Sequence, residues 1–347
     1  MKKKIILSDV SLRDGNHAVS HQIDKKIISE YCNFCEKIGI DVVEVGHGNG
    51  LGASSLSIGR SKVRDRDFFL LARSILKKSK MSIHSIPGFS KIDDLSKAID
   101  LGVDIVRVGC NSTDIDITKK QIDYCFKSKV EAWGVLMMFH LVLDKDKYLD
   151  KIKFLVDLGI KNIIIMDSAG YMLPSDIQKV FKKIKNKFKV NLGMHAHNNL
   201  GMAIANSIIS ISSGGTILDS SIRGFGAGAG NAQLEVLATV LKRLNHDIKL
   251  NFEQLYDFAE YFPKLCEKKV NYENVFSNPE NILSAEHGIF SGFSSKVDYF
   301  SKKFNVSKIE AFKAIGEKKL VAGQEDLVMN ILYNLKNKKN KKSKIKK

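Results

Sequence analysis

Proline and cysteine are both scarce in this chain of 347 residues. Only 4 prolines interrupt it and 44% of its residues are hydrophobic, so the composition excludes a disordered protein and allows a large buried core. The 5 cysteines are an odd number, which does not suit a disulfide framework. One Cys-x-x-Cys pair, Cys32 and Cys35, lies on a helical pattern with no second pair to complete a zinc site. We therefore expect buried free thiols and a cytoplasmic protein.

Long apolar stretches and acidic residues are also few. No segment approaches the roughly 20 apolar residues of a membrane span, so we expect no membrane contact. Basic residues outnumber acidic ones by 55 to 38, which gives a formal charge of +17. Much of the excess lies between Lys336 and Lys347, where no aromatic residue is interleaved with the lysines. This pattern argues against nucleic acid as a partner and predicts a basic disordered tail over residues 336–347.

Short β-branched runs alternate with amphipathic helical segments over the first 250 residues. Glycine ends several of these helical segments directly before the next run, as in KIGIDVVEV. Eight such units in roughly 245 residues suit a closed barrel better than an open sheet. We predict an α/β fold, with a TIM (β/α)8 barrel over residues 1–250 and a smaller helical domain over residues 251–335. The predicted strands are 4–8, 41–45, 81–86, 104–108, 131–139, 162–166, 190–195 and 216–222.

Polar side chains follow three of these runs, where a TIM barrel carries its catalytic groups. His195 and His197 are two residues apart, so in an extended segment their imidazoles point to the same side. A carboxylate from another strand would complete a facial metal site, and Asp14 is the best candidate. An exposed histidine pair with Asp14 in a turn remains the alternative. The polar clusters are Arg13, Asp14, Asn16 and His17 after the first run, Asp167 and Ser168 after the sixth, and His195 and His197 after the seventh.

Eight sequence blocks resemble the 4-hydroxy-2-oxovalerate aldolase family. This family belongs to a wider group of barrels that includes 3-hydroxy-3-methylglutaryl-CoA lyase and isopropylmalate synthase. The blocks follow the family order from residue 8 to about residue 328. They are SLRDGNHAVSHQ, VEVGHGNGLGASSLSIG, VRVGCNSTD, GVLMMFH, IMDSAG, HAHNNLGMAIANS, GFGAGAGNAQLE and KLVAGQEDLV.

The resemblance implies a carbon–carbon lyase, a class II aldolase that cleaves or forms a 4-hydroxy-2-oxo acid from a pyruvate enolate and an aldehyde. Asp14, His195 and His197 match the metal ligands of the family. Mn2+ is the expected ion, with Co2+, Mg2+ and Zn2+ as alternatives. Arg13 matches the arginine that steadies the enolate, and His17 matches the histidine proposed as acid and base at the substrate hydroxyl.

The resemblance also implies roles for residues around the substrate. Ser168 falls where the family contacts the substrate carboxylate, and His47 lies in a glycine-rich wall over the site. Asn231 matches an asparagine near the metal in the related lyases, or a loop contact. It ends the segment GFGAGAGN (224–231), whose backbone amides either bind an anion or pack beside the metal.

Two positions depart from the family pattern. Glu286 stands where the family usually has a tyrosine, with His287 next to it, and Asn16 replaces an apolar residue. These changes make the pocket more polar. We therefore expect Glu286 and His287 to contact the substrate, and we expect an aldehyde larger or more polar than acetaldehyde.

Two other interpretations remain open from the sequence. A Claisen-type lyase or synthase acting on an acyl-CoA would share the barrel and its motifs. A non-catalytic scaffold for a partner enzyme would keep the fold without the chemistry. The resemblance further implies an acylating aldehyde dehydrogenase as a conceivable partner, because KKLVAGQEDLV resembles a segment of the family's C-terminal domain. We also expect a homo-oligomer.

Overall fold

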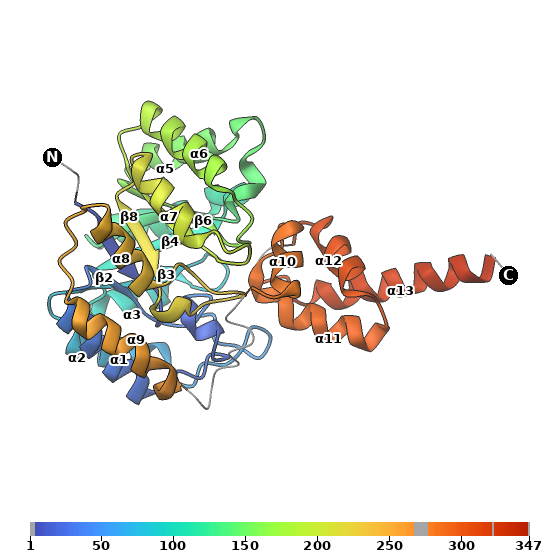
Figure 1. The fold of residues 1–347 in the computed structure, drawn as a ribbon, viewed down its shortest axis with the longest axis horizontal. Coiled ribbons are helices and arrows are strands. Elements are labelled where there is room, and N and C mark those ends of the chain that lie inside the picture. The colour runs from blue at the N-terminus through green and yellow to red at the C-terminus, as the bar shows by residue number, and fades with distance from the viewer. Residues whose placement is uncertain (1–3, 267–276, 321–322, 346–347) are drawn as a thin grey trace.

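The chain forms a closed barrel with a helical unit beside it in a computed structural model, which describes residues 4–266, 277–320 and 323–345 (Figure 1). Eight parallel strands pair in chain order, and β8 pairs back onto β1, as the TIM barrel prediction requires. Each strand overlaps its predicted run. The strands are β1 (Ile6–Asp9), β2 (Val42–Glu44), β3 (Lys80–Ser85), β4 (Ile105–Asn111), β5 (Glu131–Met137), β6 (Asn162–Asp167), β7 (Asn191–Ala196) and β8 (Ile217–Ser220).

The helices between the strands cover the outside of the barrel. The first, α1 (Lys25–Ile38), begins where the Asp24 side chain accepts a hydrogen bond from the Ile27 amide. It ends at Gly39, whose φ of 87° suits glycine. Both cysteines of the Cys-x-x-Cys pair are buried on α1, and all five cysteines are free thiols, as predicted. The remaining barrel helices are α2 (Asp65–Ile75), α3 (Ile92–Asp100), α4 (Lys119–Lys127), α5 (Tyr148–Asp157), α6 (Pro174–Lys187), α7 (Ala203–Ser212) and α8 (Leu234–Arg243).

The helix that follows α8 belongs to the barrel. In α9 (Phe252–Cys266), Leu255, Ala259 and Phe262 lie at helical spacing and join the barrel core, and Phe258 stacks on Phe34 of α1 with ring centroids 4.0 Å apart. The predicted boundary at residue 250 was therefore too early. The strand signals end there, but the apolar face of the next helix still packs onto the barrel core.

A second, smaller hydrophobic core holds the C-terminal helices together. These helices lie to one side of the barrel (Figure 1), and Phe293, Val297, Phe312, Ile315 and Leu332 are buried among them. They are α10 (Pro279–Glu286), α11 (Ser294–Phe304), α12 (Lys308–Gly316) and α13 (Leu327–Ile345).

The lysine-rich end of the chain continues the last helix. α13 extends to Ile345, so the disordered tail predicted from residue 336 is wrong for residues 336–345, while residues 346 and 347 lie outside the described residues. The segment has no proline or glycine, and lysine favours helix once a packed first half has nucleated it. Across the described ranges, no helix has both the length and the apolar character that crossing a membrane requires.

Candidate active site

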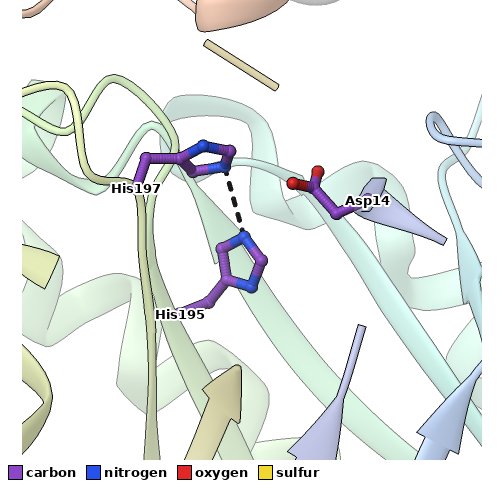
Figure 2. Close-up of side chains that lie close together, drawn as sticks. All are labelled: Asp14, His195 and His197. Atoms are coloured by element: carbon purple, nitrogen blue, oxygen red, sulfur yellow. Dashed lines mark hydrogen bonds between the residues drawn. The ribbon is translucent and has the colours of Figure 1, made fainter. Parts of the chain in front are cut away.

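The three predicted metal ligands converge at the carboxyl ends of the strands. Asp14 begins a short 3₁₀ helix after β1, His195 lies in β7, and His197 follows that strand. All three side chains are buried, and one possible ligand atom from each lies within 4.8 Å of the others. Figure 2 shows the Asp14 carboxylate and the two imidazoles pointing toward a common space. The exposed-pair alternative is thereby excluded.

Each imidazole turns its Nδ1 toward a hydrogen-bond acceptor. Nδ1 of His195 lies 2.9 Å from a carboxylate oxygen of Asp219, and Nδ1 of His197 lies 3.2 Å from the carbonyl oxygen of Ala227. An acceptor at Nδ1 favours a proton there, which leaves a lone pair on Nε2 of both rings. The two Nε2 atoms lie 3.2 Å apart (dashed line in Figure 2). Nitrogens about 2.1 Å from one metal ion and at a right angle to each other are about 3 Å apart, so the pair fits a shared cation.

The Asp14 carboxylate is held in its ionised form. Its two oxygens accept hydrogen bonds from Arg13 Nη1 at 2.7 Å and from Asn231 Nδ2 at 2.7 Å, with the Ala227 amide at 3.2 Å. Burial alone would raise the pKa of Asp14. The charge of Arg13 and the nearby imidazoles outweigh burial and hold that pKa far below its usual range. The site therefore offers one anionic carboxylate beside two imidazoles.

A chain of buried ionic groups crosses the barrel beneath these ligands. Arg13 Nε donates to Glu44 at 2.8 Å, and Arg107 lies between Glu44, at 3.3 Å, and Asp219, at 2.5 Å. Asp219 in turn accepts from His195. Two guanidinium groups thus face three carboxylates, including Asp14, so these groups carry a net charge of minus one. A buried charge excess of this sign favours a bound cation.

Arg13 also keeps one donor group free. Arg13 is 3% exposed, and its Nη2 has no hydrogen-bond partner within the described residues. Burial opposes its charge, but the carboxylates of Glu44 and Asp14 raise the pKa of Arg13 above its already high value. A fixed, permanently charged guanidinium with an unused N–H suits an anionic oxygen of a bound molecule.

A cavity of about 700 Å³ opens beside the ligand cluster, between the barrel and the C-terminal helices. His17 and Ala227 line it on the barrel side, and Phe290, Ser291 and Lys296 line it on the helical side. Burial lowers the pKa of His17, although the Asp14 carboxylate acts against this shift. At neutral pH the His17 imidazole is therefore uncharged and able to accept a proton.

Other predicted residues shape the walls of the site. Nδ1 of His47 accepts from the Asn49 amide at 3.1 Å, and Nε2 faces the Gly59 carbonyl oxygen at 3.0 Å, so both nitrogens hold their own loop. Ser168 Oγ accepts from the Met138 amide at 3.1 Å. Asn16 donates to the Gly46 carbonyl oxygen at 3.0 Å. These side chains fix the loops that surround the cavity and do not line it.

The structure does not bring Glu286 or His287 to the cavity. Glu286 is exposed at the end of α10, and neither side chain is among the cavity-lining residues. The substrate contact predicted for this pair therefore gains no support from the cavity lining and stays a prediction. Phe290 and Ser291, a few residues later in the chain, occupy the cavity wall instead.

Family models and curated relatives agree on where this chain belongs. Residues 4–261 match the family model described as HMGL-like. The chain is 43% identical to the 4-hydroxy-2-oxovalerate aldolase of Pectobacterium atrosepticum over 336 residues, which cover 96% of each protein. It is 42% identical to the protein of the same name from Spirochaeta aurantia over 335 residues, which cover 96% of this chain and 97% of that protein. The chain belongs to the 4-hydroxy-2-oxovalerate aldolase family.

The same comparisons extend to the second unit and to the fold. Residues 275–337 match a family model described as a DmpG-like communication domain. The carboxyl transferase domain of Rhizobium etli pyruvate carboxylase, solved with pyruvate and biocytin, has a TM-score of 0.83 to this chain at 13% identity. That match covers 97% of this chain and 61% of the other, and it shows a shared fold alone.

Sequence reasoning missed the charged residues inside the barrel of this aldolase-family chain. Glu44, Arg107 and Asp219 each sit within an apolar run, in DVVEV, DIVRV and TILDSSI. His84 lies in the same way within MSIHSI. A charged or polar residue in an otherwise apolar central strand is the signal that would have revealed them, since such a residue needs a partner inside the barrel.

Proposed function

We propose that this protein is a divalent-metal-dependent aldolase that cleaves or forms a 4-hydroxy-2-oxo acid, with pyruvate and an aldehyde as the other reactants. The observation that carries the proposal is the convergence of Asp14, His195 and His197 beside the free Nη2 of buried Arg13. Family membership supports the same chemistry, because the relatives are named 4-hydroxy-2-oxovalerate aldolase. Neither an acyl-CoA reaction nor a silent scaffold draws comparable support.

Asp14, His195 and His197 would hold the metal, and Mn2+ is the ion we propose, with Co2+, Mg2+ and Zn2+ as alternatives. Imidazole and carboxylate ligands are compatible with all of these divalent ions. When bound, such an ion supplies Lewis-acid stabilisation for a 2-oxo acid. Asn231 supports the ligand set through its bond to Asp14, and that bond defines its proposed role.

Arg13 stabilises the charge that develops on the substrate. Glu44 and Asp14 fix two of its nitrogens, so the guanidinium is oriented before the substrate arrives. Nη2 then donates to the oxygen of the pyruvate enolate, where negative charge grows during cleavage. Stabilisation by a preorganised donor of this kind acts mainly on the transition state.

His17 moves the proton of the substrate hydroxyl. In cleavage, the neutral imidazole accepts the proton of the C4 hydroxyl, the C3–C4 bond breaks, and the aldehyde carbonyl forms. The electron pair of that bond remains as pyruvate enolate. C3 then takes up a proton to give pyruvate while His17 gives up the one it accepted, so that no proton is gained or lost overall. The position of His17 on the cavity wall and its lowered pKa support this role.

The aldehyde partner is proposed to be larger or more polar than acetaldehyde. The cavity beyond His17 is lined by polar and charged side chains, including Asn281, Lys296, Asp298 and Glu325. A polar wall of this kind suits an aldehyde that carries polar groups of its own.

A coupled assay tests the proposed function. Purified protein is supplied with Mn2+ and 4-hydroxy-2-oxovalerate, and pyruvate release is followed with lactate dehydrogenase. We expect turnover that depends on metal and falls by about 10³-fold or more in Asp14→Asn, while exposed Asp116→Asn behaves as the parent. Thiol release from an acyl-CoA in place of pyruvate release would contradict the proposal, as would activity that survives a chelator.

An acylating aldehyde dehydrogenase is the proposed partner, and a homo-oligomer is the proposed state of the chain. The match of residues 275–337 to a communication domain supports a partner. Leu327, Met329 and Tyr333 expose apolar surface on α13 for such a contact. Size-exclusion chromatography with a purified dehydrogenase of this class tests the idea. Co-elution that Tyr333→Glu abolishes is expected, and separate elution of the two parent proteins would contradict it.

A further inference from the structure

One buried imidazole beside the site has no assigned task. His84 lies in β3, in register with Arg107 of β4, and neighbouring residues of parallel strands point to the same face. Arg107 contacts Glu44 and Asp219 across the barrel, so its side chain points inward. His84 therefore points into the barrel as well, where it feels the charges of Arg13, Arg107 and His195.

The ring of His84 is buried without partners. It is 1% exposed, and neither Nδ1 nor Nε2 has a hydrogen bond within the described ranges. Burial, followed by the nearby positive charges, holds the pKa of His84 well below its usual value, so the ring is neutral, with one N–H donor and one acceptor. A buried polar group without a partner costs about 1–3 kcal/mol. A leucine at this position would avoid that cost. The presence of an imidazole therefore indicates a ligand that forms a hydrogen bond with it.

His84 lies on the same side of the site as the proposed base. The loop of residues 46–51 packs closely against both of them. A Cβ added at Gly48 would lie 2.6 Å from Nε2 of His17, and a Cβ added at Gly50 would lie 3.3 Å from Cβ of His84. The Leu51 amide also donates to the His84 carbonyl oxygen at 2.8 Å. The loop thus packs against both residues, and the ring of His84 feels the charges of Arg13, Asp14 and His195, so it borders the site in which the proposed substrate would bind.

We propose that His84 is a specificity-determining residue that hydrogen-bonds a hydroxyl group on the aldehyde portion of the substrate. The protein then acts on 4-hydroxy-2-oxo acids that carry a further hydroxyl beyond C4. This inference rests on the proposed aldolase function. A site built to pair with a substrate hydroxyl discriminates strongly against the analogue that lacks it, since the polar group of the protein is then left unpaired.

The test compares two substrates that differ by one hydroxyl, 4-hydroxy-2-oxopentanoate and 4,5-dihydroxy-2-oxopentanoate. We measure kcat/KM for both with the parent, His84→Leu, His84→Gln and, as a matched control, His246→Leu, which removes an imidazole from the connection between α8 and α9. The parent is expected to favour the dihydroxy acid by about tenfold or more. His84→Leu is expected to bring the ratio near one, chiefly by losing the dihydroxy acid, and His246→Leu to keep the parent ratio.

His84→Gln keeps a donor and an acceptor, so it is expected to retain part of the preference and to remain informative if His84→Leu does not fold. Metal content and thermal stability are measured for each variant. A parent ratio near one, or equal losses for both substrates in His84→Leu and His84→Gln, would overturn the inference and leave the aldolase function standing. A parent that cleaves neither acid overturns both.

Discussion

Each imidazole of the proposed metal site relies on a second residue to fix which ring nitrogen carries the proton. Asp219 fixes the proton of His195 on Nδ1, and the Ala227 carbonyl oxygen does the same for His197. Of these two acceptors only Asp219 is a side chain, and it also pairs with Arg107. A single carboxylate thus serves both the ligand geometry and the charge balance of the barrel interior.

Replacing Asp219 with asparagine tests both duties. The neutral amide is expected to weaken metal affinity by about 10–100-fold, because His195 loses its anionic support. It is also expected to lower the free energy of unfolding by about 3 kcal/mol, because Arg107 keeps its charge with one carboxylate fewer. Metal titration and denaturant unfolding measure the two effects. Exposed Asp247→Asn is the control, and unchanged metal affinity in Asp219→Asn would contradict the argument.

The protonation of His17 is expected to set the pH dependence of cleavage. The base works only when neutral, so kcat/KM rises with pH through the pKa of His17 and is constant above it. Because burial lowers that pKa, the rising limb is expected below about pH 6.5, the ordinary value for histidine. At saturating metal, His17→Asn should lower kcat by about 10²–10⁴-fold and remove this limb. A limb that persists in the variant would assign the titration to another group.

Among the elements, the loop after β8 has the least room for change. Its amides serve the site and its neighbours, since Ala227 N donates to Asp14 and Ala229 N donates to Asn199. A Cβ added at Gly226 would lie 2.2 Å from Asn231 Nδ2 and 2.5 Å from Asp14 Oδ2. The glycine-rich segment therefore packs against the proposed metal ligand, which decides between its two interpretations.

Gly226→Ala is expected to displace Asp14 and to abolish tight metal binding while the barrel remains folded. Metal content after gel filtration and circular dichroism measure these two properties. Gly201→Ala is the control, because its positive φ of 73° brings strain but a Cβ there meets no atom within 4 Å. Full metal content in Gly226→Ala would contradict this expectation, because it would show that the loop can move to accommodate the added Cβ without displacing Asp14.

The regular elements were predictable because their signals are local. Apolar runs that follow glycine-capped helical segments predicted the positions of the eight strands. The spacing of His195 and His197 predicted that their imidazoles converge. Three features escaped because they depend on distant partners. The packing of α9 depends on its contact with α1, Glu44 and Arg107 need each other across the barrel, and the position of Glu286 outside the cavity lining depends on where α10 ends.

Within the described residues, the buried apolar clusters of the barrel are separate from the cluster of the C-terminal helices, so we expect two folding units. The barrel core includes the helices from α1 to α9, and the second core lies among the helices after residue 277. The cavity lies between them, so the site has walls from both. Each unit is expected to respond separately to a loss of its own packing.

Phe312→Ala removes a fully buried ring from the second core and is expected to cost that unit about 3–5 kcal/mol. Calorimetry should show a lowered transition for the C-terminal helices and an unchanged transition for the barrel. Phe126→Ala, at a position 41% exposed on α4, is the control. A single transition that shifts as a whole would mean that the two units unfold together.

The ionic chain through the barrel has a consequence for the history of the sequence. Glu44, Arg107, Asp219 and His195 lie on four different strands, and each of them pairs with at least one of the others. A substitution of one of these residues would leave the charge of its partner in the barrel interior without a counter-charge. We therefore expect the residues at these positions to change together or not at all in related sequences, while the apolar residues around them are replaced by one another more often.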